Sequence, residues 1–194
     1  MTRQFLFLIS LLFAYSCQLE TKRNTENLVL NEGQGISKYK IGQLTRDSVN
    51  QFFGNEYKLV KYESYSVAMK YEKLGLSFYY LQEDSNERIF AIACDTNFIG
   101  LTSKGFNIRK MQIKDVIRIY GVPWWRYIGN TPEAHYDSLG IYFSTISKEN
   151  PPEYINSYSL DDTFALQRLN RYYDSLYMNE KVSEISIGIP GSPF

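Results

Sequence analysis

The sequence predicts an α+β fold made of two tandem repeats, each a short helix followed by antiparallel strands. The chain contains one phrase twice, as YEKLGLSF at 71–78 and as YDSLGIYF at 136–143. The segments upstream of these phrases, 41–54 and 108–121, are also similar, and both end in glycine after an aromatic residue. Runs rich in aromatic and β-branched residues follow each segment, as strands do. One short unit buries its sheet poorly alone, whereas two packed together share a core.

The start of the chain, residues 1–16, is expected to be a secretory signal rather than part of the fold. Arg3 gives a basic beginning, and Phe5–Ala14 is an almost wholly apolar run. Such a run is too short to remain as a membrane-spanning helix but suits a cleaved signal peptide. We therefore expect an exported protein.

The end of this signal resembles the lipobox of bacterial lipoproteins. The sequence Ala14–Cys17 places small Ser16 before Cys17, which would be lipidated and become the new N-terminus. Two or three acyl chains anchor a protein firmly to a membrane. Gln18 after the cysteine, in place of aspartate, favours the outer membrane. The alternative is ordinary secretion with an incidental cysteine.

Charge and cysteine content narrow the class of protein. The 21 basic and 21 acidic side chains balance, which argues against a nucleic-acid partner because such a partner needs a basic surface. Cys94 is the only cysteine besides Cys17, so a lipidated chain has no intramolecular disulfide and must depend on its hydrophobic core. Cys94 lies in an apolar run and is expected to be a small buried hydrophobe. Residues 17–34 are polar and aperiodic, which predicts a tether.

The first repeat is expected to cover 35–98. Its helix lies within 41–54, with Thr45 as N-cap and Gly54 as the left-handed residue at its end. The residues predicted to share one helix face are Val49, Phe52 and Phe53. The predicted strands are 57–62, 66–72, 75–82 and 88–94. Gly75 falls between the second and third of these strands, where a positive φ or a bulge is needed.

The second repeat is expected to cover 99–194. Its helix lies within 108–121, and Gly140 stands where Gly75 stands in the first repeat. An insertion of about 145–180 interrupts it and includes a predicted helix from about Leu160 to Met178. The closing strand, 181–189, follows the insertion.

A loose motif supports a resemblance to a known group. Thr45 and Val49 with Gly54, and Asp115-Val116 with Gly121-Val122-Pro123, fit a threonine–x–x–x–valine…glycine–x–proline pattern. With the duplicated helix-and-strand order, this resembles the tandem-repeat fold of β-lactamase-inhibitor proteins and of small lipoproteins attached to the outer-membrane assembly machinery. The resemblance covers about 35–190 and implies binding to another protein. The secreted inhibitors carry a disulfide in each repeat, and this chain departs from them there.

The only histidine, His135, is the strongest candidate for chemistry. On a strand, Glu133, His135 and Asp137 share a face, and such a stripe can bind a metal or transfer protons. The corresponding residues of the first repeat form an ordinary solvated face, so we expect a surface stripe. A small hydrolase using His135 remains an alternative. No catalytic residue, cofactor or metal is expected.

Aromatic residues are the one compositional excess, with 17 Tyr, 12 Phe and 2 Trp. Trp124, Trp125 and Tyr127 are predicted to lie in a loop after the second helix, and Tyr142 is a further candidate for binding. Such residues bind protein partners or stack on sugar rings. The competing interpretation is that they close the core against the insertion. We therefore expect a non-enzymatic, lipid-anchored envelope protein that binds a protein partner, with a carbohydrate-binding module as the alternative.

Overall fold

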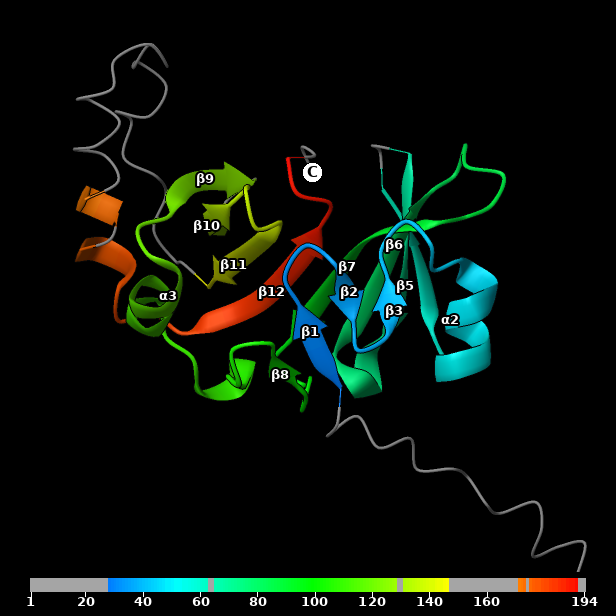
Figure 1. Cartoon of the computed structure of the whole chain (residues 1–194), viewed down its shortest axis with the longest axis horizontal. Helices are drawn as coiled ribbons and strands as arrows, with labels where there is room; N and C mark the ends of the chain where they lie inside the picture. Colours follow the sequence, from blue (N-terminus) through cyan, green and yellow to red (C-terminus); the bar gives the residue numbers. More distant parts are fainter. Residues whose placement is uncertain (1–27, 63–64, 129–130, 147–170, 174, 192–194) are drawn as a thin grey trace, which may run out of the picture.

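The computed structural model describes residues 28–62, 65–128, 131–146, 171–173 and 175–191, without the side chains of 127 and 128 (Figure 1). These residues form a mixed α and β fold that is mostly sheet, which agrees with the predicted combination of helices and antiparallel strands. Among them, no helix is long and apolar enough to cross a membrane. The predicted signal peptide and most of the predicted insertion, including the start of its helix, lie outside the described residues.

The main layer is an eight-stranded antiparallel sheet with the strand order β4-β5-β6-β7-β12-β11-β10-β9. Its two halves meet where β7 pairs with β12. The strands predicted in the first repeat and the closing strand are confirmed to within two residues at each end. The strands are β4 (Lys58–Lys61), β5 (Ser66–Tyr71), β6 (Leu76–Leu81), β7 (Ile89–Asp95), β9 (Trp124–Ile128), β10 (Thr131–Tyr136), β11 (Ile141–Thr145) and β12 (Val182–Gly188).

A small four-stranded sheet packs beside the main one, and it corrects the predicted tether. The order is β3-β2-β1-β8, and β1 runs parallel to β8. The tether cannot extend to residue 34, because Leu28 and Leu30 are buried in the core. Leu30 is the central residue of β1, and Leu28 immediately precedes the strand, so the spacing of two residues puts both side chains on one side. The strands are β1 (Val29–Asn31), β2 (Gly35–Ile36), β3 (Tyr39–Lys40) and β8 (Leu101–Thr102).

The first predicted helix is α2 (Arg46–Phe53), and its N-cap is confirmed because the Thr45 side chain accepts a hydrogen bond from the Ser48 amide at 3.3 Å. Val49 and Phe53 are buried, but Phe52 is partly exposed and packs against Tyr39. Of the three residues predicted to share one helix face, Val49 and Phe53 are therefore core residues and Phe52 is not. Val49 and Phe53 are four residues apart, so they lie one above the other on the same face of the helix.

The second predicted helix divides into two elements. A short 3-10 helix, η3 (Ile108–Lys110), precedes α3 (Ile113–Tyr120). The Asp115 carboxylate accepts a hydrogen bond from the Gln112 amide at 3.1 Å and so caps the start of α3. Ile113 and Val116 are its buried residues. Another 3-10 turn, η2 (Glu72–Leu74), joins β5 to β6.

The phrase that occurs twice in the sequence has the same physical role at both places. The Tyr71 hydroxyl donates to the Gly54 carbonyl at the end of α2, and the Tyr136 hydroxyl donates to the Gly121 carbonyl at the end of α3, both at 2.7 Å. Each tyrosine ring also packs edge-on against the phenylalanine that ends its phrase, with centroids 5.9 Å apart in both cases. The tyrosine therefore fixes the helix end to the sheet.

Replacing either of these tyrosines with phenylalanine is expected to lower the free energy of unfolding by about 0.5–1.5 kcal/mol, because a helix-terminal carbonyl loses its donor. The Tyr71→Phe and Tyr136→Phe effects should add in the double variant, since the two sites are far apart. Urea denaturation measures both, with exposed Tyr172→Phe as the control. Single variants as stable as that control would show that these bonds contribute nothing.

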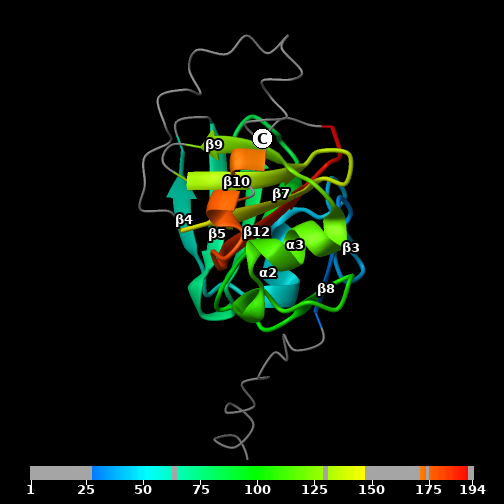
Figure 2. The same cartoon turned by 90° about the vertical axis from the view of Figure 1, so that its left-hand side faces the viewer.

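The helices and the small sheet lie on the same side of the eight-stranded sheet (Figures 1 and 2). Phe53 of α2 packs on Phe78, and Tyr120 of α3 packs on Phe143, with ring centroids 5.0 and 5.2 Å apart. The shared core lies between these layers. We call the opposite side of the eight-stranded sheet the open face, because α2, α3 and the small sheet leave it uncovered.

Candidate functional site

A candidate binding site lies on the open face, on strands β9 to β12. Because cross-strand partners in an antiparallel sheet point to the same side, the strand register shows which side chains line up there. One row begins at Trp124 on the edge strand and crosses all eight strands. Its residues, in order, are Trp124, His135, Tyr142, Ser186, Ala93, Ser77, Lys70 and Lys58.

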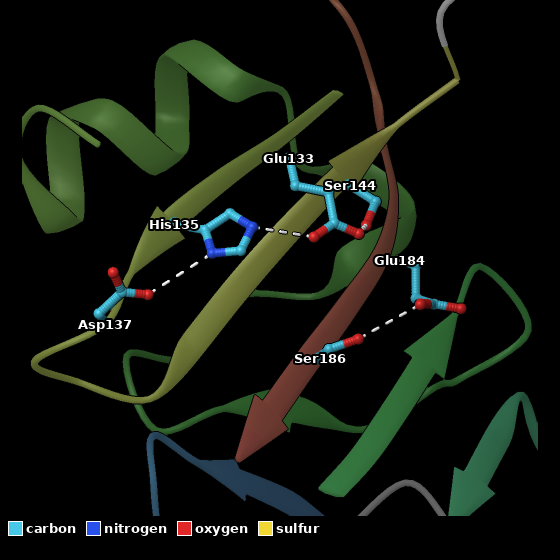
Figure 3. Close-up of polar contacts among 6 residues, drawn as sticks. All are labelled: Glu133, His135, Asp137, Ser144, Glu184 and Ser186. Carbon is cyan, nitrogen blue, oxygen red and sulfur yellow. Dashed lines mark hydrogen bonds and ion pairs between the residues drawn. The ribbon is translucent and has the colours of Figure 1, made fainter. Parts of the chain in front are cut away.

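His135, the member of this row on β10, lies between two carboxylates from its own stretch of chain (Figure 3). Its Nε2 atom is 2.9 Å from Glu133 Oε2, and its Nδ1 atom is 3.5 Å from Asp137 Oδ1. The Ser144 hydroxyl donates to the other oxygen of Glu133 at 3.0 Å. Only 2% of the His135 surface is exposed, so the expectation of a solvated stripe was wrong.

Neighbouring strands explain why His135 is buried. Alternation along β10 points Ala134 and Tyr136 into the core and His135 to the open face. There, Tyr142 of β11 packs its ring edge-on against the imidazole at 4.6 Å, and Trp124 is the cross-strand neighbour from β9. The sequence pattern identified the face correctly, but the cover comes from other strands.

The hydrogen bonds favour a structural role for the imidazole over a catalytic one. The Nε2 atom of His135 is hydrogen-bonded to Glu133. Ser144 donates to Glu133 rather than to His135, and a serine nucleophile would need the histidine as its base. Among the described residues, no group of three or more His, Cys, Asp or Glu side chains is arranged to hold a metal ion.

A second acidic group lies next to this row, on β12. Glu184 accepts a hydrogen bond from Ser186 at 3.2 Å (Figure 3). Burial raises the pKa of Glu184, and the nearby Glu133 and Asp95 carboxylates raise it further. Sequence reasoning missed Glu184, although a charged residue inside the apolar run 181–189 was a visible signal.

The variant Glu184→Gln is expected to be more stable than the wild type at neutral pH. A folded-state pKa above the unfolded value means that stability is fully present below the unfolded pKa and is lost as pH rises through the folded pKa. The wild type should therefore lose stability over that interval, and the glutamine variant should not. Urea denaturation at several pH values measures the difference. A difference that persists at low pH would contradict this account of Glu184.

The four aromatic residues predicted to bind a partner have different surroundings in the structure. Trp124 is 46% exposed on the open face, whereas Trp125 is 6% exposed and packs in the core. Both lie on β9, so the prediction of a loop was wrong. Tyr142 is buried beside His135. Tyr127 pairs with Pro132 through the backbone, and its side chain lies outside the described ones.

The interpretation that the tryptophans close the core against the insertion is confirmed for Trp125 but not for Trp124. Its ring lies 6.1 Å from Tyr173 and 5.2 Å from Tyr177, between centroids. Those tyrosines lie in the predicted insertion, where residues 171–173 and 175–177 are helical. Adjacent residues on a strand point to opposite faces, which is why the two tryptophans have different surroundings.

Comparison with known proteins gives little further information. No protein-family model matches the chain, and no curated protein matches it in sequence. A similar solved structure is the crystal structure of the uncharacterized protein yfeY from Escherichia coli. The alignment covers 84% of this chain and 99% of the yfeY chain, with 13% sequence identity and a TM-score of 0.43. The site must therefore be interpreted from its own geometry.

Proposed function

We propose that this protein is a non-enzymatic binding protein of the bacterial envelope, which docks a protein partner on the open face around Trp124. The observation that carries the proposal is a half-exposed tryptophan beside buried, hydrogen-bonded neighbours. Buried aromatic anchors contribute most of the binding energy at protein interfaces, and tryptophan is the most enriched among them. A rigid platform lowers the entropy that binding costs.

The position of Trp124 suits such an anchor. It lies on β9, an edge strand of the sheet, and its neighbours His135 and Tyr142 are buried and closely packed. A partner that covers the exposed half of the indole would remove apolar surface from water without reorganising the protein. The hydrolase alternative has less support, because the imidazole is buried and bonded to Glu133 rather than to a nucleophile.

The sequence supplies the cellular part of the proposal. The apolar run before Cys17 and the lipobox-like sequence support export and lipidation, and Gln18 favours the outer membrane. The resemblance to β-lactamase-inhibitor proteins and assembly-machinery lipoproteins supports protein binding. A lipid anchor would hold the open face near partners in the same envelope compartment.

We also propose that the fold arose by duplication of one helix-and-strand unit. The matched hydrogen bonds of Tyr71 and Tyr136 support this, as does the mirrored strand order of the two halves. Isolated bridges add a third correspondence, because Thr45 before α2 pairs with Arg88 and Gln112 before α3 pairs with Lys181. The two units then differ where specificity is expected, at β9 and the insertion.

In-cell chemical crosslinking of the tagged full-length chain, followed by purification and mass spectrometry, tests the function. The expected result is a dominant protein partner whose yield falls in Trp124→Ala. Leu59→Ala is the matched control, because Leu59 is 45% exposed but lies on the opposite edge strand, β4. Equal recovery in both variants would reject Trp124 as the anchor, and a membrane-bound chain without any protein partner would reject the function.

A further inference from the structure

The open face near Trp124 carries an exposed carboxylate, that of Asp137. The side chain of Asp137 is 53% exposed and follows directly after β10. Among the described residues, the only side chain close to its carboxylate in an ion-pair geometry is His135, at 3.5 Å. That contact is not a hydrogen bond, because Nδ1 of His135 has no hydrogen-bond partner.

His135 contacts both carboxylates but leaves most of Asp137 exposed. Its Nε2 atom is hydrogen-bonded to Glu133, whereas its buried Nδ1 atom faces Asp137 without a hydrogen bond. More than half of the Asp137 side chain stays exposed, although Nδ1 lies 3.5 Å from one of its oxygens (Figure 3). A carboxylate oxygen accepts strong, charge-assisted hydrogen bonds from a cationic donor. The exposed part of Asp137 is therefore accessible to a cationic ligand.

Aromatic rings border the same position. Trp124 is the cross-strand partner of His135, and Asp137 lies two residues after His135, just past the end of β10. A diagonal neighbour at that spacing is within reach of a tryptophan side chain. Tyr142 lies on the other side of His135, and burial and the Asp137 charge raise its pKa. Arg126, the exposed cross-strand partner of Glu133, lowers that pKa, but among the described side chains it forms no ion pair with Asp137.

We propose that this position binds a cationic side chain of the protein partner, an arginine guanidinium stacked on Trp124 and paired with Asp137. This inference rests on the proposed function and names the chemistry of the partner. A guanidinium is planar, stacks on an aromatic face and pairs with a carboxylate through two parallel hydrogen bonds. A neutral sugar fits less well, because it brings as many acceptors as donors to a site whose exposed group, Asp137, only accepts.

Tryptophan fluorescence tests the inference directly. The chain has two tryptophans, so Trp125→Phe leaves Trp124 as the single reporter. The probe is a short peptide of alternating glycine and arginine, and a glycine–glutamate peptide at the same concentration controls for ionic strength. We expect the arginine peptide to change the Trp124 emission with saturation, and the glutamate peptide to leave it unchanged.

Charge removal at Asp137 provides the decisive comparison. Asp137→Asn should weaken the peptide by about tenfold or more, since it removes a charge-assisted pair. Glu56→Gln, at an exposed carboxylate just before β4, the opposite edge strand, should leave the affinity unchanged. Circular dichroism confirms that each variant is folded.

The outcomes separate this inference from the proposed function. Equal peptide affinity in Asp137→Asn and the parent, or an emission change with a neutral maltooligosaccharide but not with the arginine peptide, would overturn the cation site. In that case, a partner recovered by crosslinking and lost in Trp124→Ala would still support the proposed function. The failure of that crosslinking, with peptide binding intact, would reject the protein partner instead.

Discussion

Replacing Gly75 with alanine is expected to lower the free energy of unfolding by roughly 3 kcal/mol or more. Gly75 has φ +63°, and an added Cβ would lie 2.3 Å from the backbone nitrogen of Phe98 and 2.6 Å from Asp95 Oδ1. The left-handed conformation alone costs about 1–2 kcal/mol, and the collision adds to it because backbone cannot move aside. Urea denaturation with the variant and wild type side by side measures the loss.

Gly105→Ala separates the two causes. Gly105 also has a positive φ, +80°, but an added Cβ would meet nothing within 4 Å. This variant should therefore lose only the conformational part, about 1–2 kcal/mol. If Gly75→Ala were no worse than Gly105→Ala, the close packing of the β5–β6 turn against residues 95–98 would be wrong.

Replacing Trp125 with alanine is expected to cost about 3–5 kcal/mol of stability, because the variant leaves a cavity beside Tyr173 and Tyr177. Its neighbour Trp124 is half exposed, and Trp124→Ala should change stability by less than about 1 kcal/mol. The two variants differ only in which face of β9 they alter. Thermal and urea denaturation measure both.

The same pair of variants shows whether a loss of partner binding comes from a loss of stability. A loss of partner in Trp124→Ala is interpretable only if the variant is as stable as the wild type. If Trp124→Ala destabilised the protein as much as Trp125→Ala, the assignment of Trp124 to the open face would be contradicted.

Much of the main sheet could be predicted from the sequence, because alternation has a fixed period that shows which residues face the core. The small sheet could not, since its strands are two or three residues long and too short to show any period. The interruption at Met111–Gln112, between η3 and α3, was also hidden, because an apolar period continues through it. The Leu-Gly turns were predicted correctly, and both Gly75 and Gly140 have a positive φ.

The candidate site was predicted only in part, for a different reason. Alternation correctly placed Glu133 and His135 on one face, but burial depends on side chains that other strands contribute. Tyr142 covers His135 from β11, and no local pattern around His135 reports that contact. The two tryptophans were grouped together because they are adjacent in sequence, although adjacency on a strand sends them to opposite faces.

Site-specific photo-crosslinking in living cells tests most directly whether the open face near Trp124 is the partner surface. A photoreactive residue replaces Val122, which is 70% exposed and precedes Trp124, or Leu59 on the opposite edge strand. Our account predicts a protein adduct at position 122 that disappears when Trp124→Ala is added, and no such adduct at position 59. Equal adducts at both positions, or an adduct at 122 that Trp124→Ala leaves unchanged, would contradict it.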